Sequence, residues 1–137
     1  MKLALGTAQF GMEYGISNVD GKTPQNSIKQ ILGYANSVGM DTIDTAIAYG
    51  NSEHCLGLAG VNGFRVITKL PPIPDGIKNV KNWVSNEIKE SLNRLKINQL
   101  DAVMLHDPIQ LFQASGNELL SALIHLKTSG VVKKIGV

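Results

Sequence analysis

Short apolar segments alternate with amphipathic ones along the whole chain, and this alternation constrains its fold more than any other feature. We predict strands at residues 3–7, 40–44, 65–69, 102–106 and 134–137, with one helix between each strand and the next. Strands this apolar are buried on both faces, and strands separated by helices pair in parallel through right-handed crossovers. The sequence therefore predicts an α/β fold built on a parallel sheet.

Residues with known capping preferences mark the starts of the predicted helices. Thr23 can cap a helix that starts at Pro24, because proline is favoured at the first helical position and a threonine hydroxyl can accept from the first free N–H groups. Ser52 and Asn117 can cap two further helices in the same way. Between 80 and 95, apolar side chains recur every three or four residues, which indicates an amphipathic helix.

Two architectures accommodate this alternation. An open, doubly wound sheet suits a single domain of 137 residues. A (β/α)8 barrel needs about 250 residues, so residues 1–137 would form roughly its first half. Length alone favours the open sheet, whereas the polar residues at the strand ends favour the half-barrel.

Composition argues against several classes of partner. The chain has 13 Lys and Arg against 11 Asp and Glu, a net charge of +2 spread along the sequence, so we expect no nucleic-acid partner. No apolar run approaches the roughly 20 residues that cross a bilayer, and the N-terminus has no signal-peptide core, so we expect no membrane partner. Cys55 is the single cysteine and has no metal-ligand spacing around it, which predicts no metal site and a cytoplasmic location.

Ionisable side chains stand at the carboxyl ends of three consecutive predicted strands. These are Asp44, Lys69 and His106, and Tyr49 follows Asp44 in the loop before the next helix. Parallel strands bring their carboxyl ends to one edge, so we expect the four side chains to converge there. A phenol is a weak acid at neutral pH, but a nearby ammonium makes it a better proton donor and a carboxylate keeps that ammonium charged. His106 would then orient a substrate carbonyl.

Four separate motifs resemble those of one known family. The sequence GMDTIDTA at 39–46 is followed by YG at 49–50, SE at 52–53 and LG at 56–57, and this pattern resembles the signature of the aldo-keto reductases. LGT at 5–7, together with Gly11, is similar to the family's first strand. VITK at 66–69 is similar to the strand that carries its lysine, and MLH at 104–106 to the strand that carries its histidine. The resemblance extends from Leu3 to Val137.

The resemblance implies a (β/α)8 fold and the NADPH-dependent reduction of an aldehyde or ketone, with a small carbonyl compound as substrate. It makes Asp44, Tyr49, Lys69 and His106 a catalytic tetrad. Tyr49 would give the proton to the carbonyl oxygen while NADPH delivers a hydride to the carbon. These roles agree with those expected from the residues themselves.

The same resemblance places Gly6, Thr7 and Asp44 against the nicotinamide end of the cofactor. The family holds the rest of the dinucleotide on the second half of its barrel, beyond residue 137, so we expect the isolated chain to bind NADPH weakly or not at all. Asp107 follows the histidine where many members have tryptophan, which suggests a more polar substrate pocket.

A half-barrel leaves apolar strand faces and two sheet edges uncovered. We therefore expect either self-association or a missing C-terminal half to cover them. Two hypotheses about function remain. The first is a truncated aldo-keto reductase that has little activity alone, and the second is a catalytically inactive half-barrel that acts as a structural or binding module.

Overall fold

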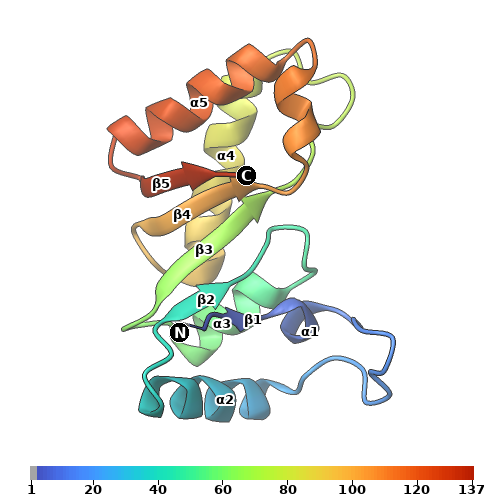
Figure 1. Ribbon diagram of the computed structural model, residues 1–137, viewed down its shortest axis with the longest axis vertical. Coiled ribbons are helices and arrows are strands. Elements are labelled where there is room, and N and C mark those ends of the chain that lie inside the picture. The colour runs from blue at the N-terminus through green and yellow to red at the C-terminus, as the bar shows by residue number, and fades with distance from the viewer. Residues whose placement is uncertain (1–2) are drawn as a thin grey trace.

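The computed structural model describes residues 3–137 and contains five parallel strands in one sheet (Figure 1). They are β1 (Leu5–Gly6), β2 (Thr42–Asp44), β3 (Arg65–Leu70), β4 (Leu100–Leu105) and β5 (Val132–Gly136). The strands lie in the sheet in their chain order, whereas a doubly wound sheet reverses its order at a switch point. The half-barrel prediction is therefore confirmed and the doubly wound alternative is wrong. The sheet formed by the described residues is not closed.

Helices connect consecutive strands. They are α2 (Gln25–Ser37), α3 (Ser52–Ala59), α4 (Val80–Leu95) and α5 (Gly116–Thr128). Each of these helices packs against the next one along the chain, so together they form a continuous layer along the sheet (Figure 1). Two short helices, α1 (Ala8–Gly11) and the 3-10 helix η1 (Pro108–Phe112), follow β1 and β4 directly and were not predicted.

The predicted start of α2 is wrong by one residue. Pro24, rather than Thr23, occupies the N-cap, with φ −61° and ψ 147°. The Pro24 carbonyl accepts the first helical hydrogen bond, from Ile28 N at 3.0 Å, while the N–H of Thr23 donates to Gln9 O at 2.9 Å. Thr23 is therefore tied to the loop after β1, and the helix begins one residue later than the capping pattern indicates.

Two other predicted caps are also wrong. Ser52 is the first residue of α3 rather than its cap, because its hydroxyl turns inward and donates to Thr7 O at 2.9 Å. Asn117 lies inside α5, whose N-cap is Ser115. The η1 turn brings the chain into helical conformation early, and Leu119 N donates to Ser115 O at 2.9 Å.

The core lies between the sheet and the helix layer. Along β3, Val66, Thr68 and Leu70 are buried, whereas Ile67 and Lys69 alternate with them and stay partly exposed. Successive side chains of a strand point to opposite faces, so the partly exposed face is the one that would line a barrel interior. The strands and helices also contribute fully buried aliphatic residues: Ile28, Ile43, Leu56, Val84, Ile88, Val103, Leu119 and Val132.

Candidate active site

Four polar residues meet at the carboxyl edge of the sheet. Asp44 ends β2, Lys69 lies one residue before the end of β3, and His106 follows β4 directly. Tyr49 is in the loop between β2 and α3. Because the strands are parallel, their ends share one edge, and the structure brings the four side chains together as their positions predicted.

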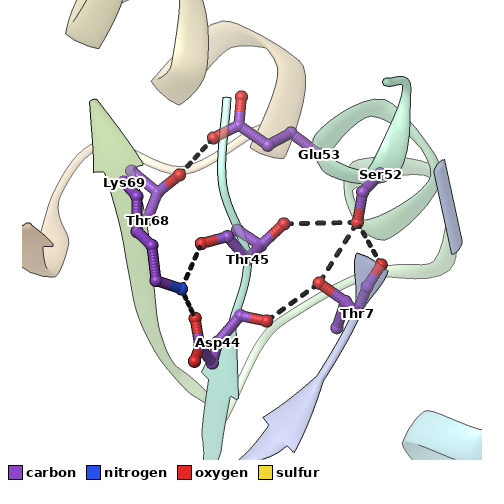
Figure 2. Close-up of polar contacts among 7 residues, drawn as sticks. All are labelled: Thr7, Asp44, Thr45, Ser52, Glu53, Thr68 and Lys69. Atoms are coloured by element: carbon purple, nitrogen blue, oxygen red, sulfur yellow. Dashed lines mark hydrogen bonds and ion pairs between the residues drawn. The ribbon is translucent and has the colours of Figure 1, made fainter. Parts of the chain in front are cut away.

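Lys69 and Asp44 form an ion pair in which Lys69 Nζ donates a hydrogen bond to Asp44 Oδ1 (Figure 2). Lys69 Nζ also lies 3.4 Å from the carbonyl oxygen of Thr45. The Lys69 side chain is 17% exposed and that of Asp44 is 44% exposed, so the ammonium is the more enclosed partner. The carboxylate and the carbonyl together hold the ammonium at the rim of the sheet.

Tyr49 lies near both the lysine and the histidine. Lys69 Nζ is 5.5 Å from the centre of the Tyr49 ring. The rings of Tyr49 and His106 are 5.8 Å apart between centroids and stand edge to face at 87°. Tyr49 is half-buried and His106 is exposed, so a small molecule has access to the histidine side of the site. The arrangement places a phenol beside a cation and an imidazole, which is suited to proton transfer.

A cleft of about 350 Å³ adjoins Tyr49. Its lining comes mostly from the chain after β1: Gly6, Thr7, Ala8, Gln9, Phe10, Tyr14 and Tyr49. A Cβ atom built on Gly6 would meet nothing within 4 Å, so there is open space in front of this glycine. Thr7 is buried and its hydroxyl donates to Asp44 O at 3.0 Å, which ties β1 to the end of β2.

Beneath the ion pair lies a group of three buried hydroxyls, Thr7, Thr45 and Ser52, which we call the hydroxyl cluster. Ser52 Oγ lies 3.1 Å from Thr7 Oγ1 and 3.2 Å from Thr45 Oγ1. Figure 2 shows Ser52 reaching from α3 to both threonines. The cluster joins α3 to the ends of β1 and β2.

A second buried group, the carboxylate cluster, surrounds Glu53, whose side chain is 2% exposed. Glu53 Oε1 accepts from Thr68 Oγ1 and from Ser91 Oγ, each at 2.7 Å. Glu53 Oε2 accepts from Arg94 Nε at 2.8 Å, so the charge is paired. In the sequence Glu53 stands only as part of the SE motif at 52–53, and this role was not predicted. The pairing partners lie too far along the chain for local spacing to reveal them.

The loop that carries Tyr49 is held by two glycines. A Cβ atom on Gly11 would lie 1.8 Å from Tyr49 O and 2.3 Å from Ser52 N. Gly50 has φ +56°, a conformation that favours glycine, and a Cβ there would lie 2.4 Å from Gly11 O. The end of α1 therefore packs backbone to backbone against the residues that follow Tyr49.

Several other candidate groups lie away from this site. Asp107 caps η1 by accepting from Ile109 N at 3.0 Å, so this aspartate has a structural role. The more polar substrate pocket suggested for Asp107 stays a prediction. At the far end of β3, the Arg65 guanidinium donates a hydrogen bond to the Asp41 carboxylate, and this bond raises the pKa of Arg65. Within residues 3–137, no group of three or more His, Cys, Asp or Glu side chains is placed to hold a metal ion. No helix in that range combines the length and apolar character needed to span a membrane.

Comparison with known proteins gives a consistent result. The model of the "Aldo/keto reductase family" matches residues 2–137. Methylglyoxal reductase DkgB of Escherichia coli O157:H7 is 29% identical over 82% of this chain and 41% of its own length. The NAD/NADP-dependent indole-3-acetaldehyde reductase of Schizosaccharomyces pombe is 31% identical over 97% of this chain and 44% of its own length.

A solved structure, the putative aldo-keto reductase PA4992 from Pseudomonas aeruginosa, is similar with a TM-score of 0.79 and 24% identity. The match covers 96% of this chain and 53% of that one. At this identity the likeness shows the fold alone. The chain therefore spans about half the length of the proteins that it matches.

Proposed function

Since the chain belongs to the aldo/keto reductase family, we propose that its site donates the proton in the NADPH-dependent reduction of an aldehyde or ketone. The observation that carries this proposal is the position of the Tyr49 ring, whose centre lies 5.5 Å from Lys69 Nζ and 5.8 Å from the centre of the His106 ring. The two relatives are oxidoreductases named for aldehyde reduction or for methylglyoxal reduction. Small carbonyl compounds are therefore the substrates to test first.

Each of the four residues has a distinct role in this proposal. The Tyr49 hydroxyl donates its proton to the carbonyl oxygen of the substrate. Lys69 stabilises the phenolate that remains, and Asp44 holds the Lys69 ammonium charged and in place. His106 lies at the exposed side of Tyr49 and orients the carbonyl by a hydrogen bond.

The residues present fit the nicotinamide end of the proposed cofactor. The open space in front of Gly6 and the cleft beside Tyr49 leave room for a flat ring next to Thr7, and Asp44 is the register partner of Gly6 on the neighbouring strand. When bound, the dinucleotide supplies the hydride that the carbonyl carbon receives. Gly6, Thr7 and Asp44 are the residues of this chain that would contact it.

The proposal is tested with the longest natural polypeptide that contains this chain. Oxidation of NADPH is followed in the presence of methylglyoxal for the unchanged protein, for Tyr49→Phe and for Tyr34→Phe. Tyr34 is 72% exposed on α2, so its substitution controls for the loss of a phenol elsewhere. We expect Tyr49→Phe to lower kcat by about 10²- to 10⁴-fold, the usual contribution of a general acid. Equal rates for the two variants would refute the proposal.

An inactive structural or binding module is the second candidate function, and the open sheet favours it. The β5 edge ends beside an apolar groove of about 220 Å³. Its lining is Leu105, Leu111, Leu120, Leu123, Ile135, Gly136 and Val137. A second copy of the chain, or the remaining half of a barrel, would cover this groove and the exposed edges.

We further propose a cytoplasmic location, because Cys55 is a free, buried thiol.

A further inference from the structure

We propose that Glu53 is a positioning residue: through Thr68 its buried carboxylate fixes the place of β3, and with it the places of Lys69 and of the segment leading to Tyr49. This inference rests on the proposed function, because it concerns the geometry of the residues that carry that function. Glu53 touches none of the four site residues in any contact described above. Its influence has to pass through the strand.

The first step is the bond between Glu53 and Thr68. Thr68 is fully buried and sends its hydroxyl away from the site, 2.7 Å from Glu53 Oε1. The next residue, Lys69, leaves β3 toward Asp44 (Figure 2). The bond that holds Thr68 toward α3 therefore sets how far the Lys69 side chain extends from the opposite face of β3.

The second step is the pair of carbonyl groups on either side of Thr68. Ile67 O accepts from Thr45 N at 2.9 Å, and Lys69 O accepts from Ile47 N at 3.1 Å. These two bonds attach the segment 45–47, which follows Asp44 and precedes Tyr49, to β3. A displacement of β3 at Thr68 moves both acceptors together, and with them the segment that leads to Tyr49.

The third step concerns the neighbouring residue on α3. Ser52 donates to Thr7 O at 2.9 Å and lies within hydrogen-bond distance of Thr45. The Thr7 backbone N–H and hydroxyl both donate to Asp44 O, at 3.1 and 3.0 Å. The first two residues of α3 thus hold β1, the end of β2 and β3 at once, on the helix side of the site.

Burial of the Glu53 carboxylate costs desolvation free energy that an apolar side chain would not cost. An apolar side chain of similar volume would often give equal or greater stability than a buried ion pair. Glu53 instead contributes directional hydrogen bonds, because its two oxygens accept from Thr68, Ser91 and Arg94 at 2.7 to 2.8 Å. These bonds allow one position of β3 relative to α3 and α4.

The chain offers a matched pair of variants for the test. Thr68→Val and Ser91→Ala each remove one hydroxyl, from two fully buried residues that donate to the same Glu53 oxygen at the same distance. Only Thr68 lies on the strand that carries Lys69. The readout is the NMR signal of the Lys69 side-chain ε-methylene in protein labelled with ¹³C-lysine, assigned by its loss in Lys69→Arg. The denaturant midpoint of each variant is measured in parallel.

We expect Thr68→Val to shift the Lys69 signal toward those of the exposed lysines, and Thr68→Ser, which restores the hydroxyl, to return it. Ser91→Ala should lower the denaturant midpoint by a similar amount and leave the Lys69 signal in place. An unchanged signal in Thr68→Val, or equal shifts in Thr68→Val and Ser91→Ala, would overturn the proposal. If Thr68→Val does not fold, Thr68→Ala, which also removes the hydroxyl, takes its place: a shift of the Lys69 signal that Ser91→Ala does not reproduce supports the proposal, and an unchanged signal overturns it. The readout needs neither cofactor nor substrate, so a lack of NADPH oxidation would refute only the proposed function.

Discussion

Substitution of Gly11 by alanine tests whether α1 holds the Tyr49 loop. The added Cβ would lie 1.8 Å from Tyr49 O, 2.3 Å from Ser52 N and 2.9 Å from Ser52 Cα. All three atoms belong to the backbone, so no flexible side chain can turn away. To reach ordinary contact at 3.4 Å, the Tyr49 backbone has to move by about 1.6 Å. Overpacking of this kind costs about 3 kcal/mol, at the upper end of the usual range.

The expected decrease in the free energy of unfolding is large enough to measure by thermal unfolding. At about 4 °C per kcal/mol for a chain of this size, Gly11→Ala should lower Tm by about 12 °C. Gly33→Ala is the matched control, because Gly33 lies inside α2 and a Cβ there would meet nothing within 4 Å. It should raise Tm by about 4 °C, since alanine favours a helix over glycine by about 1 kcal/mol.

A second readout follows the position of Tyr49 itself. In Gly11→Ala, the contact between the Tyr49 and His106 rings should be lost, and with it the ring-current effect on the His106 proton signals. A displacement of about 1 Å in a catalytic group can cost about 10²-fold in rate, so activity should fall by at least that factor. The reasoning fails if Gly11→Ala unfolds at or above the original Tm with the His106 signals unmoved.

Three further predictions concern charge, cofactor and assembly. Arg94→Ala leaves the buried Glu53 carboxylate without its cation and should cost about 3 kcal/mol in urea unfolding. Lys133→Ala removes an exposed lysine that lies 3.4 Å from the Asp101 carboxylate, and it should cost about 1 kcal/mol. Titration of the isolated chain with NADPH, followed by Trp83 fluorescence and calorimetry, should give weak binding or none, and a micromolar Kd would contradict this. Size exclusion with light scattering should give a mass above that of the monomer, because the open face and edges expose apolar surface; a stable 14.7 kDa species would contradict self-association.

The fold could be predicted from the sequence because its signals are local. The segment at 102–106 is short and almost continuously apolar, the one at 65–69 has Val66 and Ile67 at its centre, and each is followed by a helix, so a parallel sheet is the arrangement that buries them. The place of Asp44, Lys69 and His106 at strand ends then predicts where they meet. Their convergence needed no information beyond the strand boundaries.

The supporting residues could not be predicted in this way. Glu53 in the first turn of a helix is an ordinary position for an exposed acid, and only the fold brings Ser91 and Arg94 to it from 38 and 41 residues away. The short helix α1, which ends at Gly11, could not be predicted, because four helical residues are too few to give a periodic signal. The capping prediction at Thr23 was wrong by one residue, and no local pattern reveals that the Thr23 N–H bonds to the distant Gln9 O.

The sequential order of the strands has a consequence for how the molecule is made. Each strand pairs with the one synthesised just before it, so no stretch of chain has to wait for a distant partner in order to build the sheet. Such local connectivity favours fast folding and allows a chain to fold while it leaves the ribosome. The side chains of the site span Asp44 to His106 and come from the carboxyl ends of three neighbouring strands and the loop that follows β2. The part of the molecule that we propose to donate the proton would therefore take shape on the nascent chain soon after His106 emerges.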